Sequence, residues 1–535
     1  MGAWPPLAVQ AGLCLLFALW IVLDVHVLHL SKGLARSTYD AMVRHRVSAA
    51  PPDGRIVIVD IDEASLARMA PQFGRWPWPR DTLASVLDHI EAQAPLAIVW
   101  DVVFSDADRL SPGGDAAFDA AAARSAHSHF AVIRLPASND GASRITRQAL
   151  PGLWLPAEQG AAAVVEKHAV ALVPPALPAI ATGRLGYVNG SADADGVLRH
   201  YRYAERTPAG TIQSLPLSVA RAVNPAAAAR HLSADEEADA GPGRLIAWRR
   251  TAHSYQRVSF ADVHARADGT AGDRAAASFK GRIVIIGATA PGLNDNHPTP
   301  LSPAHDGVDI LATVLDNSVN GHDMAEFPRW AMSLMTIALC LGGVAFVRVS
   351  SASALDPGLA MFVIPAVLIA ISYASLSFGG MFLELQLPAG LLLVFLAVLR
   401  WWNHLRREHW CELPPGGGQL LVWPWQRGTP WIGAALDRLI DAVQQHAPEC
   451  RVVVLDANTA TRRHLRWPEF ACYAAIAGPV DAIEQAQDSL GAAMRRLASR
   501  HLDPIAVAPG PVRAQVAAAA IEGWAALQNS DTTRT

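Results

Sequence analysis

The apolar residues of this chain are concentrated in four long runs, one near the N-terminus and three close together before Arg400. The segment between the first run and the others, residues 31–327, is mostly polar. A helix needs about 20 apolar residues to cross the hydrocarbon core of a membrane. The runs approach or reach that length: Leu7–Leu23, Trp330–Val347, Leu359–Phe378 and Met381–Leu399. The pattern predicts four transmembrane helices, one before a large polar domain and three after it.

Basic residues in short flanking segments favour the cytoplasmic side of a membrane. Arg400–Arg407 follows the last run, and Arg348 lies between the second and third runs. Both indicate that the N-terminus is cytoplasmic and that residues 31–327 lie outside the cytoplasm, which in a Gram-negative bacterium is the periplasm. Four basic residues after the first run favour the opposite orientation: Lys32, Arg36, Arg44 and Arg46. Because the first run lacks a basic start and a small-residue cleavage site, we expect a retained anchor rather than a signal peptide.

This pattern predicts four regions: an anchor (1–30), an extracytoplasmic domain (31–327), three transmembrane helices (328–400) and a small cytoplasmic α/β domain (401–535). The 535 residues carry a formal net charge of only -4, so the composition does not indicate a nucleic-acid partner. The extracytoplasmic domain contains no cysteine. We therefore expect a hydrophobic core, rather than disulfides, to stabilise it.

The extracytoplasmic segment has the pattern of an α/β domain. Short apolar runs bounded by turn residues predict four buried strands: Arg55–Ile61, Leu96–Phe104, Phe130–Leu135 and Arg282–Gly287. Apolar residues at helical spacing predict helices over Arg80–Ala94 and Asp115–His127. Alternating strands and helices are typical of parallel crossovers. Shorter antiparallel strands are expected later: Leu185–Val188, Leu198–Ala204 and Arg244–Trp248.

Ionisable residues collect at the ends of these strands. Asp60, Asp62 and Glu63 close the first strand, Asp101 lies within the second, and Asp295 and His297 follow the fourth. These six residues and the basic residue Arg80 are the candidate ligand-binding residues. Ligands of open parallel sheets bind outside the carboxyl ends of the strands, and an oxygen-rich site of this kind suits a divalent metal. The alternative is structural: the carboxylates cap helices or pair with Arg80 and Arg199. No cofactor is indicated by a tight ligand spacing.

Several segments, in order, closely resemble the CHASE2 extracellular sensory domain. The match runs from about Tyr39 to Gly321. The segments that carry it are Ile58–Leu66, Trp76-Pro77-Trp78-Pro79-Arg80, Asp101–Phe104, Gly186–Asn189, Asp193–Arg199, Lys280–Gly287 with the chain on to Asp295 and Thr299-Pro300, and Gly307–Ala312. The resemblance implies a sensory domain that faces out of the cell and is followed by three spans. It supplies no ligand, because the stimuli of these domains are mostly undefined.

The resemblance also implies a cytoplasmic kinase or cyclase, and the C-terminal region departs from that expectation. From Arg400 onward there is no Lys, which protein kinases and P-loops require. His404 and His409 are not followed by a Gly-rich nucleotide lobe, no Gly-Gly-Asp-Glu-Phe-like turn occurs, and Asp456 lacks the second Asp of a class III cyclase. We expect no recognisable catalytic output, and leave enzymatic activity open.

Three hypotheses follow for the function. The first is a membrane receptor that detects an extracytoplasmic signal and transmits it through its helices to a non-catalytic domain or partner. The second is an assembly protein of an envelope complex with the outer domain as scaffold, and the third is an envelope hydrolase. Expected partners are the membrane and an unidentified cytoplasmic signalling or assembly protein, with a homodimer left open. The basic residues Arg462, Arg463 and Arg466 either contact such a partner or form a solvated loop.

Overall fold

The computed structural model describes residues 6–156, 168–235, 243–270, 277–293, 295–322, 324–349, 357–410, 418–426, 432–456, 470–485 and 505–510. The chain divides into two compact units. The α/β unit comprises Gly33–Phe327 and the short segment Ile371–Leu383. The helical unit comprises Met1–Lys32, Pro328–Ala370 and Glu384–Thr535, and it includes a small C-terminal sheet.

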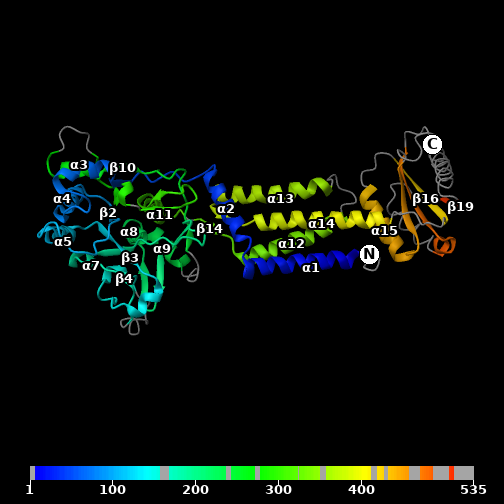
Figure 1. Ribbon diagram of the computed structural model, residues 1–535, viewed down its shortest axis with the longest axis horizontal. Coiled ribbons are helices and arrows are strands. Elements are labelled where there is room, and N and C mark those ends of the chain that lie inside the picture. The colour runs from blue at the N-terminus through cyan, green and yellow to red at the C-terminus, as the bar shows by residue number, and fades with distance from the viewer. Residues whose placement is uncertain are drawn as a thin grey trace. The chain divides into compact units, whose positions relative to one another are not determined.

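The α/β unit is built on a seven-stranded sheet (Figure 1). Six strands are parallel, in the order β10-β1-β11-β2-β3-β5, and β4 pairs antiparallel with β3. The strands are β1 (Ile56–Ile61), β2 (Ala97–Trp100), β3 (Ser128–Arg134), β4 (Leu172–Val173), β5 (Arg184–Tyr187), β10 (Gln256–Ser259) and β11 (Ile283–Ala288). Every residue of β1 is buried, as the continuous Ile and Val run predicts for a central parallel strand covered on both faces.

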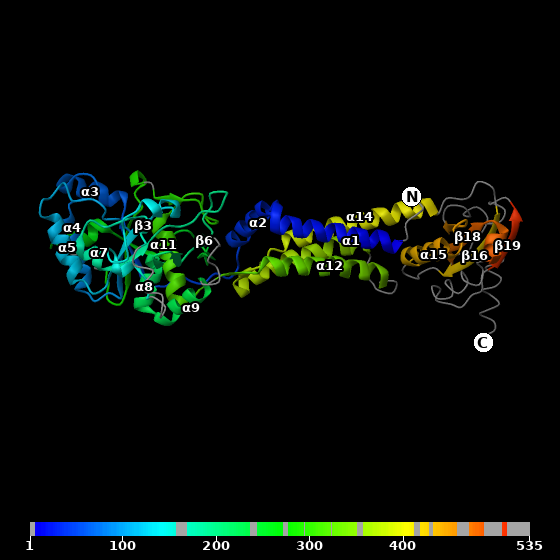
Figure 2. The same ribbon diagram turned by 90° about the horizontal axis from the view of Figure 1, so that it is seen from below.

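Helices cover both faces of this sheet (Figures 1 and 2). The main apolar cluster joins alternate residues of β1, such as Val57 and Val59, to one helical layer. That layer contains α3 (Glu63–Phe73), α4 (Arg80–Glu91), α5 (Gly114–Arg124) and α10 (Phe260–Ala267). The opposite layer contains α8 (Leu215–Val223) and α11 (Gly307–Asn320), with α9 (Pro225–Asp235) packed against both. Because strand side chains alternate, Asp60 faces the α11 layer.

The predicted parallel α/β core is confirmed, and three details of the prediction are wrong. β2 ends at Trp100, so Asp101 lies beyond the strand rather than within it, because the pairing of β2 with β11 stops at Trp100. β5 pairs parallel with β3 rather than antiparallel, because the chain crosses over between them through α7 (Pro178–Thr182). The predicted strand Leu198–Ala204 is split into β6 (His200–Tyr201) and the start of β7 (Ala204–Thr207).

Short elements complete the α/β unit. Three antiparallel pairs lie outside the main sheet: β6 with β9 (Arg244–Leu245), β7 with β8 (Gly210–Gln213), and β12 (Asn296–His297) with β13 (His305–Asp306). Single 3-10 turns are η2 (Ala137–Ala142), η3 (Pro151–Leu153) and η4 (Pro291–Leu293). Helix α2 (Lys32–Arg44) precedes the sheet and presents buried Tyr39 and Met42.

A parallel strand pair links two distant parts of the chain within this unit. β14 (Ala325–Glu326) pairs with β15 (Met381–Phe382). The amide of Ala325 donates to the Gly380 carbonyl at 3.0 Å, and the Tyr39 ring packs edge-on against Phe382 at 5.0 Å. The prediction that the fourth apolar helix begins at Met381 is therefore wrong, because this backbone is extended and paired.

The described residues of the helical unit form four long helices. They are α1 (Pro6–Leu23), which continues as the π-helix η1 (Asp24–Leu28), α12 (Arg329–Val349), α13 (Pro357–Ala374), which continues as η5 (Ser375–Gly379), and α14 (Gln386–Trp410). α1 packs against α12 and α14, with the Phe17 and Phe395 rings 5.4 Å apart (Figure 2).

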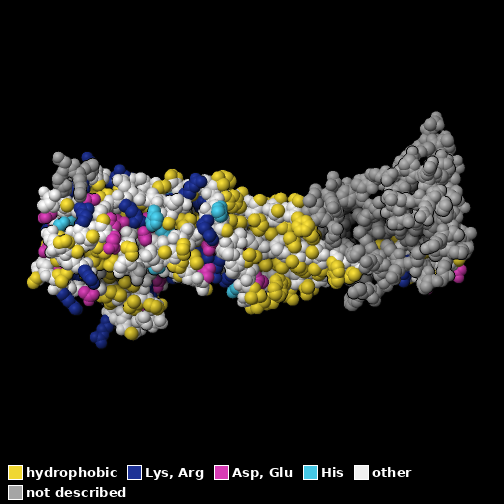
Figure 3. Space-filling model, turned by 45° about the horizontal axis from the view of Figure 1, so that its top comes forward, with side chains coloured by type: hydrophobic (Ala, Val, Ile, Leu, Met, Phe, Trp, Pro, Cys, Tyr) yellow, Lys and Arg dark blue, Asp and Glu magenta, His cyan; other side chains and the backbone are white. Residues whose placement is uncertain are grey.

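The surface of these helices is rich in exposed apolar side chains (Figure 3), of which Leu15 is 73% and Leu341 57% exposed. Such a surface marks contact with lipid or protein. Two helical segments, Gln10–Leu28 and Met361–Gly379, are long and apolar enough to cross a membrane. Trp330–Gly343 and Gln386–Leu399 are shorter apolar helices.

The C-terminal region forms a four-stranded antiparallel sheet in the order β17-β18-β16-β19. Its described elements are β16 (Gly418–Gln426), α15 (Ile432–His446), β17 (Arg451–Asp456), β18 (Phe470–Gly478) and β19 (Ile505–Gly510). Sequence analysis did not predict β18, whose Ala-rich run contains one β-branched residue, Ile476. The basic residues Arg462, Arg463 and Arg466 lie outside the described residues.

Candidate functional site

The carboxyl edge of the sheet brings two of the predicted aspartates into one row. Asp60 pairs in register with Gly287 of β11, and the next residue after the Ile286–Trp100 pair of β11 and β2 is Asp101. A side chain at Gly287 would collide with Val308 of α11, so glycine lets this helix approach the strand ends closely. The row therefore lies directly against the start of α11.

Asp60 is held by two hydrogen bonds, although it is almost fully buried. Thr289 Oγ1 donates to one carboxylate oxygen at 2.7 Å, and Arg257 Nη1 donates to the other at 2.7 Å. Arg257 lies on the neighbouring strand β10, opposite Ile58 in the register. The ion pair thus joins the edge strand β10 to the central strand β1.

The second terminal nitrogen of Arg257 points to three further groups. Arg257 Nη2 lies 3.3 Å from Asp306 Oδ2 and 3.1 Å from His253 Nδ1, and it also contacts Asp309 Oδ2. Asp306 is the N-cap residue of α11, and Asp309 lies in its first turn. We call these residues the Arg257 cluster: Asp60, His253, Arg257, Asp306 and Asp309. It combines three carboxylates with a single guanidinium, beside a helix N-terminus that favours negative charge.

Asp309 is the most deeply buried member of the Arg257 cluster, with 0% of its surface exposed. Its Oδ2 atom accepts from Arg257 and His253, whereas Oδ1 has no hydrogen-bond partner among the described residues. Burial raises the pKa of this carboxyl, and the nearby Arg257 opposes the shift. His253, by contrast, has a side chain that is 62% exposed, so the cluster runs from the core to the solvent.

A family model described as CHASE2 domain matches residues 13–349. The chain belongs to the CHASE2 domain family. The match includes the second half of α1 and all of α12 as well as the whole sheet of the α/β unit, so it extends beyond the segment from Tyr39 to Gly321 in which the motifs lie. CHASE2 is a family of extracellular sensor domains. No curated protein and no solved structure matches the chain.

A second ionisable group in the CHASE2 domain joins three of the predicted residues. His297 Nε2 lies 3.3 Å from Asp295 Oδ1, and this hydrogen bond raises the pKa of His297. Asp101 is half-buried, and no hydrogen bond to its carboxylate is present among the described residues. Burial, with the nearby Asp295, raises the pKa of Asp101 to about 7, while His297 opposes the shift. Asp295 also contacts the start of α11 through the amide of Gly307.

The remaining predicted residues serve other local structures. Asp62 caps α3 by accepting from the Ser65 amide at 2.7 Å, and Glu63 is exposed on the first turn of that helix. Arg80 pairs with Asp115, and its guanidinium stacks 5.5 Å from the Phe104 ring. The predicted pairing of strand-end carboxylates with Arg80 is therefore wrong, because Arg257 occupies that role from a strand closer to Asp60.

Arg199, the other predicted partner of these carboxylates, pairs with Asp40, Asp193 and Asp195 instead.

Sequence analysis missed four members of the Arg257 cluster: His253, Arg257, Asp306 and Asp309. One signal could have identified Asp309, which interrupts the apolar run Val308–Ala312 at a position that the helical period places inside. A charged residue at such a position is rarely buried without a partner. Nothing in the short strand β10 distinguishes Arg257 from an ordinary exposed arginine.

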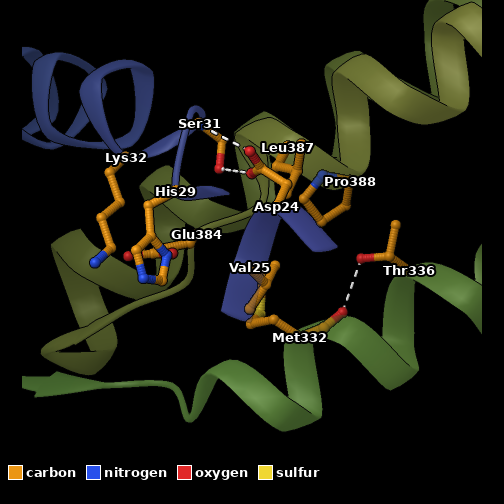
Figure 4. A pocket seen from close by; sticks show the side chains of 10 residues that line it. All are labelled: Asp24, Val25, His29, Ser31, Lys32, Met332, Thr336, Glu384, Leu387 and Pro388. Carbon is orange, nitrogen blue, oxygen red and sulfur yellow. Dashed lines mark hydrogen bonds between the residues drawn. The ribbon is translucent and has the colours of Figure 1, made fainter. Parts of the chain in front are cut away.

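The helical unit contains a separate polar hollow, lined by residues of η1, the turn that follows it up to Lys32, α12 and the start of α14 (Figure 4). One oxygen of buried Asp24 accepts from the amides of Leu30 and Ser31, and the other from Ser31 Oγ. Figure 4 shows Lys32, His29 and Glu384 gathered on one side of it. Glu384 lies in the connection between the strand β15 and the helix α14. Because Asp24 is occupied in closing its own turn, the Arg257 cluster is the stronger candidate site.

Proposed function

We propose that this protein is a multi-pass receptor of a bacterial inner membrane, whose periplasmic CHASE2 domain detects a signal at the carboxyl edge of its sheet. Binding at the Arg257 cluster shifts α11, and the shift passes to the membrane helices that follow. A ligand drives such a change only as far as its affinities for the two states differ. The C-terminal region transmits the signal by protein contact rather than by catalysis.

The β14–β15 pair is the observation that carries this proposal. β14 follows α11 by only four residues and directly precedes α12, whereas β15 lies between α13 and α14. Two backbone hydrogen bonds, from Ala325 to Gly380 and from Phe327 to Phe382, join these strands. We therefore expect a displacement at the end of α11 to reach this strand pair and, through it, the segments that lead into α12 and α14.

Two of the four basic residues after the first apolar run contact the α/β unit. Arg36 pairs with Asp193 at 3.4 Å, and Arg46 Nη2 donates to the Trp248 carbonyl at 3.4 Å. These contacts support a structural role for Arg36 and Arg46, rather than retention of the segment in the cytoplasm.

Reporter fusions test the orientation. Alkaline phosphatase fused after Ala120 should be active, and the same enzyme fused after Leu405 should be inactive, with fluorescent-protein fusions giving the reverse pattern. A phosphatase that is inactive after Ala120 contradicts a periplasmic domain and with it the receptor.

Hydrogen exchange tests signal transmission. In the full-length protein in nanodiscs, Asp309→Asn should change amide exchange of Ala325 and Phe327 by at least about threefold, a free energy of about 0.7 kcal/mol. The matched control Asp115→Asn also removes a carboxylate that pairs with an arginine, but it lies on α5 and should leave both amides unchanged. If a folded Asp309→Asn protein shows wild-type exchange at β14, the domain is a scaffold rather than a sensor.

A further inference from the structure

His253, Asp306 and Asp309 offer the donor set of a transition-metal site. Each contributes one ligand atom, and these three atoms lie within 4.8 Å of one another. His253 Nδ1 lies 2.9 Å from Asp309 Oδ2 and 3.7 Å from Asp306 Oδ2. Ligand atoms about 2.0–2.2 Å from a common zinc ion lie roughly this far apart. The donors come from a loop before β10 and from the first turn of α11.

The contacts of Arg257 show that the three donor groups surround a position that holds a positive charge. Its Nη2 atom contacts all three donor groups at once, and its Nη1 atom is separately bonded to Asp60 at 2.7 Å. The side chain can therefore release the three donors and still keep Asp60. Arg257 is one-quarter exposed, which leaves it room to move.

The charges around Asp309 are not balanced by Arg257 alone. Three carboxylates face one guanidinium, and the buried Oδ1 atom of Asp309 has no donor among the described residues. Burial of a carboxylate without full pairing is costly. A divalent cation would supply the missing positive charge and an additional contact for this carboxylate.

We propose that the Arg257 cluster binds one divalent transition-metal ion of the zinc class through His253 Nδ1, Asp306 and Asp309, in competition with Arg257. An imidazole nitrogen among the ligands favours such ions over Mg²⁺ and Ca²⁺, which prefer oxygen. The exposed His253 gives the ion an entry path. On binding, the ion replaces Arg257 Nη2 as the partner of the first turn of α11, and Arg257 remains with Asp60. The inference rests on the proposed function, since it names the ligand class of the same site.

Equilibrium dialysis of the chelator-treated full-length protein against Zn²⁺, with excess Mg²⁺ present, tests the proposal. One equivalent should bind, and His253→Ala and Asp306→Asn should each weaken binding by at least about tenfold. Arg257→Ala should tighten binding, because it removes the competing cation. His297→Ala is the matched control from the neighbouring Asp295 pair and should leave the affinity unchanged.

Several outcomes overturn the metal site: no stoichiometric Zn²⁺, equal competition by Mg²⁺, wild-type affinity in His253→Ala, or loss of binding in His297→Ala. His253 is exposed, so its substitution keeps the test valid if Asp306→Asn fails to fold. The receptor is judged separately by exchange at Ala325 and Phe327. If Asp309→Asn changes amide exchange at β14 but the protein binds no Zn²⁺, the receptor hypothesis stands and the metal site is rejected. If the protein binds Zn²⁺ but exchange at β14 does not change, the metal site stands and the receptor hypothesis is rejected.

Discussion

Helix α11 carries two buried aspartates, Asp309 and Asp316, seven residues apart and therefore on one face. Both have 0% exposed surface, and both pair with an arginine. Asp316 is fully bonded: Arg249 contacts both oxygens, and the amide of Asp53, the Tyr255 hydroxyl and Asn320 donate as well. Asp309 has two partners on one oxygen and none, among the described residues, on the other.

The surroundings of the two arginines differ in the same way. The Arg249 side chain is 1% exposed and sealed between Asp316, Asn317 and the Ala247 carbonyl. Arg257 is reached from solvent past His253. A sealed ion pair whose carboxylate is bonded through both oxygens fixes the structure, whereas an open pair with an unpartnered carboxylate oxygen leaves room for a ligand. The same residue types at the two ends of one helix therefore serve different purposes.

The largest expected effect separates these two arginines. Arg249→Met leaves the carboxylate of Asp316 buried and unpaired, so the free energy of unfolding should fall by about 3–5 kcal/mol. Arg257→Met should lower it by about 1–2 kcal/mol, because Asp60 keeps its hydrogen bond from Thr289 and Asp309 keeps its partner His253. Denaturant unfolding of the full-length protein in detergent measures both. Equal losses would show that the two ends of α11 are equivalent.

The Asp101→Asn variant tests whether there is excess negative charge near the N-terminal end of α11. The folded pKa of about 7 lies above the ordinary value, so the wild-type protein is favoured at low pH and loses stability as the pH rises toward and through 7. The asparagine variant does not ionise. It should match the wild type near pH 4 and be more stable by about 2 kcal/mol at pH 8. Thermal melts across this range measure the difference, and a constant difference would contradict a raised pKa.

A smaller dependence of stability on pH is expected at His200, which lies beside β14. Its pKa is raised by neighbouring carboxylates, whereas that of Asp101 is raised by burial. Burial lowers the pKa of His200, but the hydrogen bonds that it donates to Asp193 at 3.1 Å and Glu326 at 3.2 Å outweigh this and raise the pKa to about 9. The charged histidine thus stabilises the fold fully below about pH 6.5, and this contribution is lost as the pH rises through 9. Relative to His200→Gln, the wild type should lose about 1–2 kcal/mol between pH 6.5 and 9.5.

The control for His200 is His127→Gln, whose histidine pairs with Glu91 on the more exposed surface of α4 and α5. Its stability difference from the wild type should vary much less over the same pH range. If the two variants behave alike, the link from β6 to Glu326 of β14 does not depend on a buried charge.

Local sequence was sufficient for a core of four parallel strands, β1, β2, β3 and β11, and for the candidate positions of Asp60 and Asp101. The strands of that core are continuous apolar runs, and such runs indicate burial regardless of what packs on them. The partners of Asp60 could not be predicted in this way. Arg257 and Asp309 are 197 and 249 positions from Asp60 in the sequence. The residues around each of them give no sign that folding brings them close to Asp60.

Composition and short-range periodicity were enough to locate the apolar helices and the cysteine-free α/β domain between them. The resemblance to the CHASE2 family depended on the order of its motifs along the chain. Long-range contacts decided that Arg80 at the start of α4 pairs with Asp115, and that Met381 lies in a strand pair rather than a helix. Each of these depends on which groups long-range pairing brings within hydrogen-bond distance, and a buried charge finds its partner in space rather than along the chain.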